Sequence, residues 1–276
     1  MTSVAGKKVL ITGAAMGMGK LYAQRAVREN AAAVVLWDID EIDLKQTAAE
    51  LEAAGGRVHP YVVDVSRLEA IEAAAARVRQ EVGDIEILIN NAGVVRGKYF
   101  WEHEHRPDTH FTMSVNTLAP MYITREFLPA MMASRTECRI VTMASAAGLV
   151  ANPRMSVYAA SKWAAIGWSD SLRLELKQAG YKHIKVTTVC PSYVSTGMFE
   201  GAKGPLLTPI LTPEAVVDAV WKKMKRGTPF VLMPWTVRLA KAFNGVLPIG
   251  PRDFISDRIF GVYHSMDHFT GHHPQG

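Results

Sequence analysis

The sequence predicts an α/β protein built on a doubly wound parallel β-sheet, and three observations support this prediction. Short apolar runs alternate along the chain with longer segments whose apolar residues recur at helical spacing. Repeated strand–helix–strand units place helices on both faces of a parallel sheet. A cluster of glycines follows the first apolar run, at the position where such sheets commonly bind a ligand.

The strands are expected in seven places, each separated from the next by a segment long enough for a helix. The segment after the second strand, EIDLKQTAAELEAAGG, ends in two glycines, which are a strong stop signal for a helix. No internal repeat, low-complexity stretch or linker interrupts the pattern, so residues 1–276 are expected to form a single domain. The expected strands are 7–12, 32–38, 57–64, 85–90, 138–145, 184–191 and 229–234.

The composition is that of an ordinary globular protein. Hydrophobic residues make up 49% and charged residues 21% of the 276, enough to bury a substantial core. The formal net charge is +5, but Lys and Arg are scattered rather than gathered with aromatic residues, so no nucleic-acid partner is expected. A basic surface would attract an anionic cofactor or a membrane surface, and both alternatives stay open.

The cysteines and the length of the apolar runs bear on location. Cys138 and Cys190 lie in strand-like runs, which favours two buried thiols in a reducing compartment over a single disulfide. No signal peptide precedes the first strand, and no apolar run reaches the roughly 18 residues of a membrane span. We therefore expect a cytoplasmic protein without a transmembrane segment.

The string TGAAMGMGK, residues 12–20, joins the first strand to the first helix. Glycines at this place allow a tight turn and let backbone N–H groups approach a pyrophosphate at the positive end of the helix. A flexible loop is the alternative, but the position between a strand and a helix is the context that the motif requires. The string therefore predicts a dinucleotide-binding fold of Rossmann type. Its expected contacts are Gly13, Ala15, Met16, Gly17, Met18 and Gly19.

Asp38 ends the second strand, where a carboxylate can accept hydrogen bonds from the adenosine ribose. A helix N-cap is the alternative for this residue. The same carboxylate would repel a 2′-phosphate, and its expected neighbours, Met16 and Ile39, offer no positive charge to hold one. We therefore expect NAD rather than NADP, with Ile39 beside the ribose.

Tyr158 and Lys162, in SVYAASKWAA, are four residues apart and so share one face of a helix. Alone, this pair is better explained by an amphipathic helix with an exposed lysine next to an aromatic residue. However, TGAAMGMG, NNAG (90–93), Ser145 and YAASK follow one another in this order. With this set, the sequence resembles the short-chain dehydrogenase/reductases over residues 6–234.

The resemblance implies a catalytic set. Tyr158 would be the general acid/base, and Lys162 would hold the nicotinamide ribose and lower the pKa of the tyrosine. A positive charge about 5 Å away, in an effective dielectric near 20, contributes about 3 kcal/mol, or roughly two pKa units. Ser145 would hydrogen-bond the substrate oxygen, and Asn116 would position a water beside the lysine. The pair is thus expected to make a phenol acidic enough to act as a base.

The resemblance also implies the remaining cofactor contacts. Asp64 and Val65 would flank the adenine. Ser192 stands where the family often has glycine after a proline, which puts the local loop shape in question. The further expected contacts are Asn91, Ala92 and Gly93 under the adenosine, and Pro191, Val194 and Thr196 at the carboxamide end.

Longer strings, among them VLWDID, LINNAGVV and VCPSYVSTGMF, look like the retinol and 17β-hydroxysteroid dehydrogenase branch of the family. The expected substrate is a small hydrophobic secondary alcohol or ketone, and residues 193–212 form the variable, largely apolar substrate region. Arg96 and Arg154 are the alternatives if the substrate carries a carboxylate or phosphate. The expected substrate contacts are Val95, Ser145, Tyr193, Met198, Phe199 and Leu206.

Residues 235–276 follow the last expected strand. Trp235, Leu239, Phe243 and Val246 fall at helical spacing, which fits a lid over the substrate, an oligomer contact or an interfacial membrane helix. His264 and His268, four apart, have a spacing that can chelate a metal. Without a third ligand in a convincing place, a mobile histidine-rich tail is the preferred interpretation, and no metal is expected.

Two other functions stay open. A 3-oxoacyl thioester reductase would normally prefer NADPH, which Asp38 disfavours. A non-catalytic NAD(H)-binding regulatory scaffold is the other, although such family members usually lose the tyrosine, lysine or serine. The family usually pairs the helices on either side of the serine strand, here 107–134 and 156–179, so a homodimer or homotetramer is expected.

Overall fold

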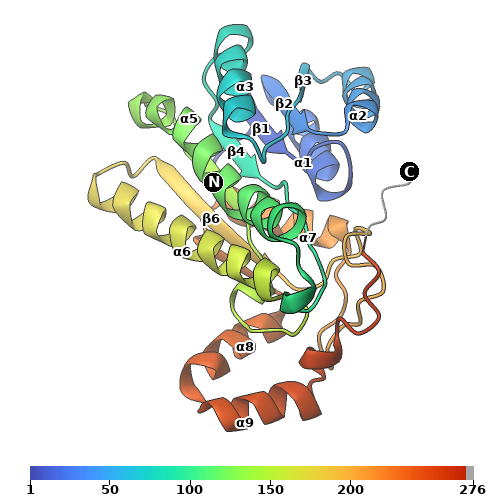
Figure 1. Ribbon diagram of the computed structural model, residues 1–276. Coiled ribbons are helices and arrows are strands. Elements are labelled where there is room, and N and C mark those ends of the chain that lie inside the picture. The colour runs from blue at the N-terminus through green and yellow to red at the C-terminus, as the bar shows by residue number, and fades with distance from the viewer. Residues whose placement is uncertain (272–276) are drawn as a thin grey trace.

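Seven parallel strands form one sheet in the computed structural model, which describes residues 1–271 (Figure 1). The strand order is β3-β2-β1-β4-β5-β6-β7, so the direction of winding reverses between β1 and β4. This confirms the predicted fold class, and each expected strand is present. Their bounds are β1 Lys8–Thr12, β2 Ala33–Asp38, β3 Val58–Val62, β4 Ile87–Asn90, β5 Cys138–Met143, β6 Ile184–Pro191 and β7 Phe230–Met233.

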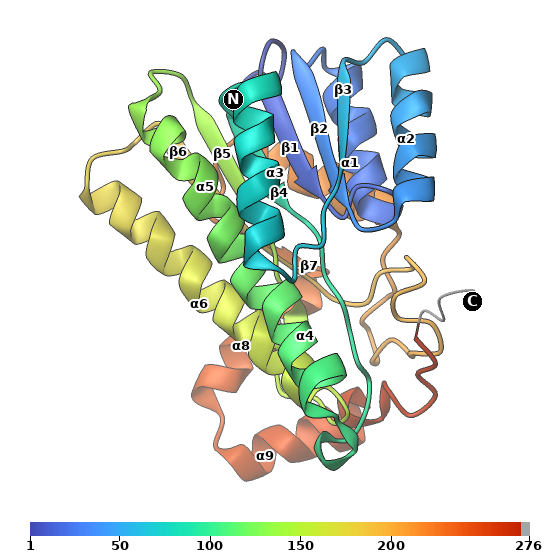
Figure 2. The same ribbon diagram turned by 45° about the horizontal axis from the view of Figure 1, so that its top comes forward.

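Helices cover both faces of the sheet, as the views in Figures 1 and 2 show. Residues of α1 (Gly17–Arg28), α2 (Glu41–Ala53) and α7 (Pro213–Lys225) belong to one hydrophobic core. The other core contains residues of three helices on the opposite face: α3 (Leu68–Glu81), α5 (Ala119–Ala133) and α6 (Ser156–Gln178).

The two cores follow from the alternation of side chains along each strand. In β1, Val9 and Ile11 belong to the first core, whereas Leu10 belongs to the second. In β2, Val34 lies in the first core and Val35 in the second. Because both faces are covered, these strands are apolar throughout instead of alternating with polar residues.

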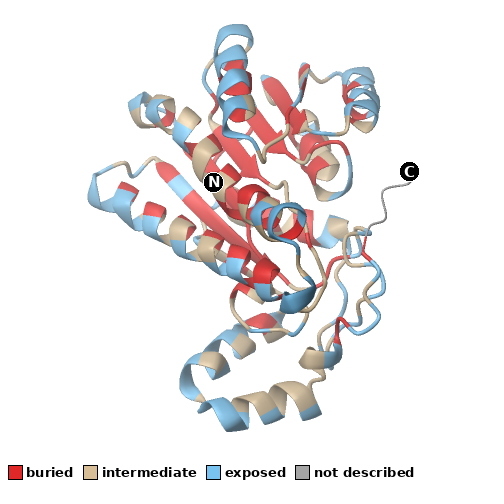
Figure 3. Ribbon diagram, in the orientation of Figure 1, coloured by how far each residue is buried: buried red, intermediate tan, exposed pale blue. Residues whose placement is uncertain are grey.

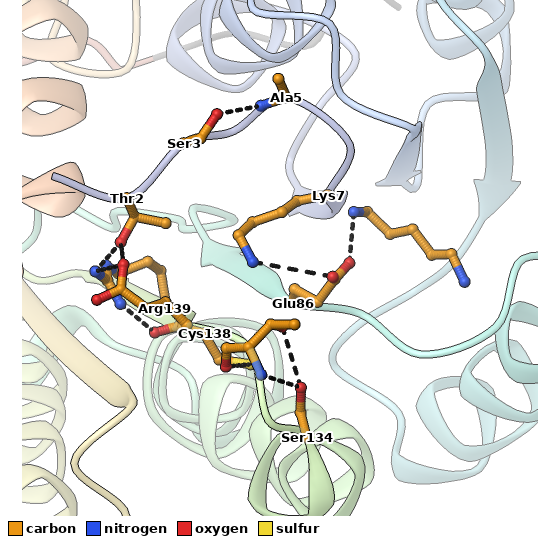
Figure 4. Close-up of polar contacts among 11 residues, drawn as sticks. Thr2, Ser3, Ala5, Lys7, Glu86, Ser134, Cys138 and Arg139 are labelled. Atoms are coloured by element: carbon orange, nitrogen blue, oxygen red, sulfur yellow. Dashed lines mark hydrogen bonds and ion pairs between the residues drawn. The ribbon is translucent and has the colours of Figure 1, made fainter.

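The amino ends of the central strands are closed by a polar network around Arg139 in β5 (Figure 4). This guanidinium is 3% exposed and donates hydrogen bonds to the carbonyl oxygens of Met224 and Cys138 and to the Glu137 carboxylate. Thr2 also hydrogen-bonds both charged side chains and so ties the start of the chain to this end of the sheet.

Two further helices, α8 (Trp235–Val246) and α9 (Ile249–Phe254), lie apart from the layered body, below the carboxyl ends of the strands in Figure 1. Figure 3 shows them largely as exposed or intermediate, and Val237 is the buried residue of α8. None of the helices within residues 1–271 has both the length and the apolar character needed to cross a bilayer.

The remainder of the chain corrects one expectation. The mobile tail predicted around His264 and His268 is wrong for residues 263–271, because Ser265 and Met266 are 2% and 1% exposed. The last two histidines of the predicted tail, His272 and His273, lie outside the described residues. Both cysteines are buried and free, which confirms the interpretation of two buried thiols.

Candidate active site

The predicted site residues gather at the carboxyl ends of β1, β4, β5 and β6, beside the point where the strand order reverses. The glycine loop follows β1, the NNAG string ends β4, and Ser145 comes shortly after β5. Crevices at this edge are the usual ligand sites of open α/β sheets.

The glycine loop can adopt its shape only with the glycines that the sequence supplies. A Cβ on Gly19 would collide with the carbonyl oxygen of Gly13. Gly13 itself has φ +64°, and a Cβ there would lie 2.9 Å from the Cα of Ala92. The α1 N-cap, Met16, makes no side-chain capping bond in the described chain, so the first N–H groups of the helix are available to an anion. The loop therefore fits a pyrophosphate.

Asp38 is joined directly to this loop. Its Oδ2 accepts a hydrogen bond from the amide of Ala15 at 2.8 Å, and its Oδ1 accepts one from the amide of Asp40 at 3.1 Å. The N-cap of α2 is Asp40, whose side chain accepts from the amide of Asp43, so the N-cap alternative for Asp38 is wrong. Thr47, which no sequence motif singles out, donates to the carbonyl of Ala15 at 2.6 Å.

The NNAG string is tied to the same loop. The side-chain amide of Asn91 donates to the carbonyl oxygens of Thr12 and Gly13, both at 3.0 Å. The hydroxyl of Thr12 accepts from the amides of Asn91 and Ala92, also at 3.0 Å. After β3, Asp64 accepts from both the amide and the hydroxyl of Ser66. Half-buried Val65 packs against the second core.

Gly93, Asn116 and Lys162 converge behind this loop. A Cβ on Gly93 would lie 3.3 Å from Oδ1 of Asn116 and 3.5 Å from Nζ of Lys162. Asn116 exchanges two hydrogen bonds with the backbone of Val94 and donates a third to the hydroxyl of Ser161. It lies in a π-helical turn, Ser114–Leu118, of the kind that often marks functional sites.

Tyr158 and Lys162 share the inner face of α6, as their spacing predicts. Lys162 is 4% exposed, its Nζ donates to the carbonyl of Met143 at 2.9 Å, and it lies 5.6 Å from the centroid of the Tyr158 ring. The exposed-lysine alternative is therefore wrong. Tyr158 is also 4% exposed and hydrogen-bonds Ser145, whose Oγ accepts from the amide of Ala147.

Burial dominates the titration of this pair. It raises the pKa of the Tyr158 phenol, and the hydrogen bond with Ser145 opposes that change. Burial also lowers the pKa of Lys162 to about 8. In the protein by itself, desolvation of the phenolate is thus the largest influence on the Tyr158 pKa, and its direction is opposite to the expected net lowering. At pH 7 the lysine remains mostly protonated.

A cavity of about 250 Å³ is lined by Ser145 and by residues of the carboxyl-terminal helices. Most of its lining is apolar. Trp235, Leu239 and Phe243 of α8 line it, so this helix forms one wall. The oligomer-contact and membrane alternatives for the helix stay predictions. Other apolar lining residues include Ala147, Val150, Met155, Tyr193, Phe199, Leu207 and Leu247, and the polar lining residues include Asn152, Asn244 and Arg252.

The predicted substrate contacts divide into three groups. Ser145, Tyr193 and Phe199 line the cavity. Val95 and Met198 instead pack in a cluster with Tyr158. Among the described residues, Leu207 lines the cavity in place of its neighbour Leu206, although both side chains are largely exposed.

The remaining predicted cofactor contacts are Thr196, Val194, Pro191, Met16, Met18 and Ile39, and Thr196 lies beside the glycine loop. The side chain of Thr196 lies within 4.0 Å of where a Cβ on Gly17 would be. Ser192, at the departure from the family pattern, donates its amide to the carbonyl of Met233. Val194 is buried, and Pro191 ends β6. Met16 and Ile39 are exposed, and Met18 packs against the first core.

The arginines considered for an anionic substrate and the histidines considered for a metal contact other side chains of the protein. Arg96 pairs with Asp108, and Arg154 lies over the ring of Tyr99 and 3.9 Å from Asp267. His264 contacts the carboxylates of Asp257 and Asp267, whereas exposed His268 is separate from it. Within residues 1–271 no three His, Cys, Asp or Glu side chains gather in a way that would hold a metal.

Comparison with known proteins agrees with this geometry. The family model for short chain dehydrogenase matches residues 7–204. The chain belongs to the short-chain dehydrogenase family. It is 39% identical to epidermal retinol dehydrogenase 2 of Mus musculus over 274 residues, which are 98% of this chain and 87% of that protein. It is 37% identical to estradiol 17-beta-dehydrogenase 11 of Rattus norvegicus over 257 residues, 93% and 85% of the two chains.

The solved short-chain dehydrogenases agree as well. The structure of a Burkholderia phymatum member in complex with NAD superposes with a TM-score of 0.80, at 28% identity, covering 89% of this chain and 96% of that one. Other similar structures hold NADP or NADPH. This short-chain dehydrogenase is therefore an oxidoreductase that acts on CH–OH groups with NAD(P), and the resemblance seen in its sequence is confirmed.

Proposed function

We propose that this short-chain dehydrogenase transfers a hydride between NAD(H) and a hydrophobic secondary alcohol or ketone of retinol or hydroxysteroid type. One observation carries the proposal: a largely apolar cavity is lined by Ser145, whose side chain interacts with the phenol of Tyr158. Such a cavity would stabilise a lipophilic substrate by burial, and the Ser145 hydroxyl would orient the substrate oxygen toward Tyr158.

In the proposed reaction Tyr158 takes the proton of the substrate hydroxyl during oxidation and returns it during reduction. The hydroxyl of Ser145 donates a hydrogen bond to the substrate oxygen and stabilises the charge that develops there. Bound nicotinamide would supply the hydride acceptor or donor. Residues Gly13–Gly19, Asp38 and Asn91–Gly93 would hold the dinucleotide.

Lys162 would assist through its charge. Because its pKa is about 8, it carries a proton at neutral pH and favours the phenolate of Tyr158. The bonds of Asn116 to Val94 and Ser161 fix the amide beside the lysine, where it can order a water. Burial keeps the Tyr158 phenol protonated at neutral pH, so oxidation is expected to speed up as pH rises.

The preference for NAD is proposed from Asp38. Its carboxylate lies beside the loop amide of Ala15, at the end of β2 where a ribose would bind. A 2′-phosphate placed there would meet a negative charge. Met16 and Ile39 next to it supply no positive charge.

The test is initial-rate formation of NADH from NAD⁺, with NADP⁺ in parallel, on retinol, a hydroxysteroid, 2-octanol and a 3-hydroxyacyl thioester. Turnover of the lipophilic alcohols with NAD⁺ and its loss in Tyr158→Phe are expected. Tyr22→Phe is the matched control, because Tyr22 is also fully buried but lies in α1. Preferred turnover of the thioester with NADP⁺ would replace the proposal with the reductase. Tight NADH binding without any turnover would replace it with the regulatory scaffold.

A further inference from the structure

The carboxyl-terminal segment returns to the catalytic tyrosine after the last helical turns. Met266 is 1% exposed and belongs to the buried cluster that contains Tyr158, Val95, Met155 and Tyr193. Phe269 packs against the same cluster while partly buried. Residues more than a hundred positions from the tyrosine in sequence thus help to enclose it.

Two glycines from different loops make room for this segment. A Cβ on Gly97 would collide with the ring of Phe269 and lie 3.0 Å from Cε of Met266. A Cβ on Gly201 would collide with the carbonyl oxygen of His268. Gly97 lies in the loop after β4 and Gly201 in the loop after β6, and both strands end at the site. The absence of a side chain at these two positions lets residues 266–269 pack closely against both loops.

Polar contacts hold the segment in register with the cavity wall. The amide of Lys203 donates to the carbonyl of Ser265 at 2.9 Å, and the amide of Thr270 donates to the carbonyl of Glu200 at 3.0 Å. The hydroxyl of Ser265 donates to the carbonyl of Val262, so it accepts from the hydroxyl of Tyr193 at 2.8 Å. Tyr193 is thereby fixed where it lines the cavity.

We propose that residues 265–269 back the lining of the substrate site, through the cluster that Met266 shares with the lining residues Met155 and Tyr193, and that Met266 determines how much bulk a substrate can carry beside its reacting carbon. The inference rests on the proposed function, because that carbon must approach the Tyr158 hydroxyl. The carbon's substituents then have to fit among the side chains that enclose the phenol. Met266 is the buried side chain that the carboxyl-terminal segment, as described here, adds to that enclosure.

The first test compares kcat/KM for 1-cyclohexylethanol and for 2-octanol. Met266→Ala is expected to raise the ratio of the bulky to the linear alcohol by about 10-fold, since hydrophobic pockets discriminate by this order for small changes in volume. Met266→Leu, similar in volume, should keep the ratio within about twofold. Met131→Ala is the matched control, because Met131 is equally buried but lies in the second core. An unchanged ratio in a folded, active Met266→Ala would overturn the inference.

The second test needs no activity. Hydrogen peroxide oxidation, read by mass spectrometry, should leave Met266 as protected as Met131, whereas Met16, 44% exposed, should oxidise readily. Gly97→Ala should expose Met266 to oxidation without changing the protection of Met131. Oxidation of Met266 at the rate of Met16 in the unmodified protein would overturn the inference. If no alcohol is oxidised, the proposed function fails, and this second test still decides whether residues 265–269 back the lining.

Discussion

Two buried cations lie near opposite ends of β5, and they differ in the hydrogen-bond and ion-pair partners that surround them. Arg139, near the start of the strand, is 3% exposed, and Lys162, bonded to the carbonyl of Met143 at its end, is 4% exposed. Burial lowers the pKa of both. Their burial is the same, but their partners are not.

The positive charge of Arg139 is compensated by a neighbouring carboxylate. Arg139 donates to a carboxylate and two carbonyl oxygens, and the negative charge of Glu137 raises its pKa against the effect of burial. Lys162 donates to one carbonyl, and no carboxylate within residues 1–271 forms an ion pair with it. An uncompensated buried charge costs stability. The charge at the amino end of the sheet is thus compensated, whereas the charge at the carboxyl end is not, as the proposed role of Lys162 in the reaction requires.

The largest expected effect concerns activity. Lys162→Met should lower kcat by about 100-fold, because it removes a charge that contributes about 3 kcal/mol to stabilising the phenolate. Arg139→Met should leave kcat of the folded enzyme unchanged. Steady-state alcohol oxidation with saturating NAD⁺ measures both. Equal losses in the two variants would remove the functional difference between the two cations.

For the free energy of unfolding the order of the two variants should be reversed, with the larger loss in Arg139→Met. Arg139→Met is expected to lower the free energy of unfolding by about 3 kcal/mol, because buried carbonyl groups and Glu137 lose their partner. Lys162→Met should be neutral or stabilising, since an unpaired buried charge is replaced by an apolar side chain of similar length. Urea unfolding monitored by circular dichroism measures both. A Lys162→Met protein as unstable as Arg139→Met would contradict the comparison.

The pH dependence of stability sharpens the same point. The pKa of Lys162 is about 8 in the folded protein and 10.5 when unperturbed, so between these values the unfolded chain binds more protons. The free energy of unfolding should therefore rise with pH through this window. The contribution is about 2 kcal/mol by about pH 9.5. Measured as the difference between the unmodified protein and Lys162→Met, the effect of other titrating groups cancels. A difference that does not change with pH would show that Lys162 is not buried as described.

The smallest expected effect lies elsewhere at the carboxyl edge. Asp38→Asn should raise kcat/KM for NADP⁺ relative to NAD⁺ by about 10-fold, because one repulsive charge is removed while an amide oxygen can still accept from Ala15. Asp40→Asn is the matched control, since its side chain caps α2. If both variants gave the same ratio, Asp38 would not be the residue that selects the cofactor.

The fold and most of the loop around β1 could be predicted because they depend on local patterns. Apolar runs mark the strands, and Gly13 and Gly19 are required by contacts close in the chain or in the adjoining loop. The serine, tyrosine and lysine were recognisable from their spacing, with Ser145 just after β5 and the other two on α6. The roles of these residues, and the expected pairing of copies through the helices around β5, stay predictions.

Other features depend on contacts that no local pattern announces. The direction of the Tyr158 pKa shift was wrong because a charge and its distance can be estimated from sequence, whereas the desolvation of a phenol cannot. Met266 and Ser265 looked like parts of a mobile polar tail because the partners that bury them lie in loops far away in sequence. Leu206 and Leu207 are adjacent and equally apolar, so only the loop's course decides which one faces the cavity.

The most direct test of the account is the pH profile of single-turnover NADH formation by the unmodified enzyme and Tyr158→Phe, with saturating NAD⁺ and a lipophilic alcohol. The account predicts a rate that rises tenfold per pH unit below the phenol's pKa in the enzyme. It also predicts a rate about 10³-fold lower and independent of pH in Tyr158→Phe. A Tyr158→Phe enzyme that keeps the rate and the pH dependence of the unmodified protein would contradict the assignment of the acid/base and, with it, the proposed reason for the buried charge of Lys162.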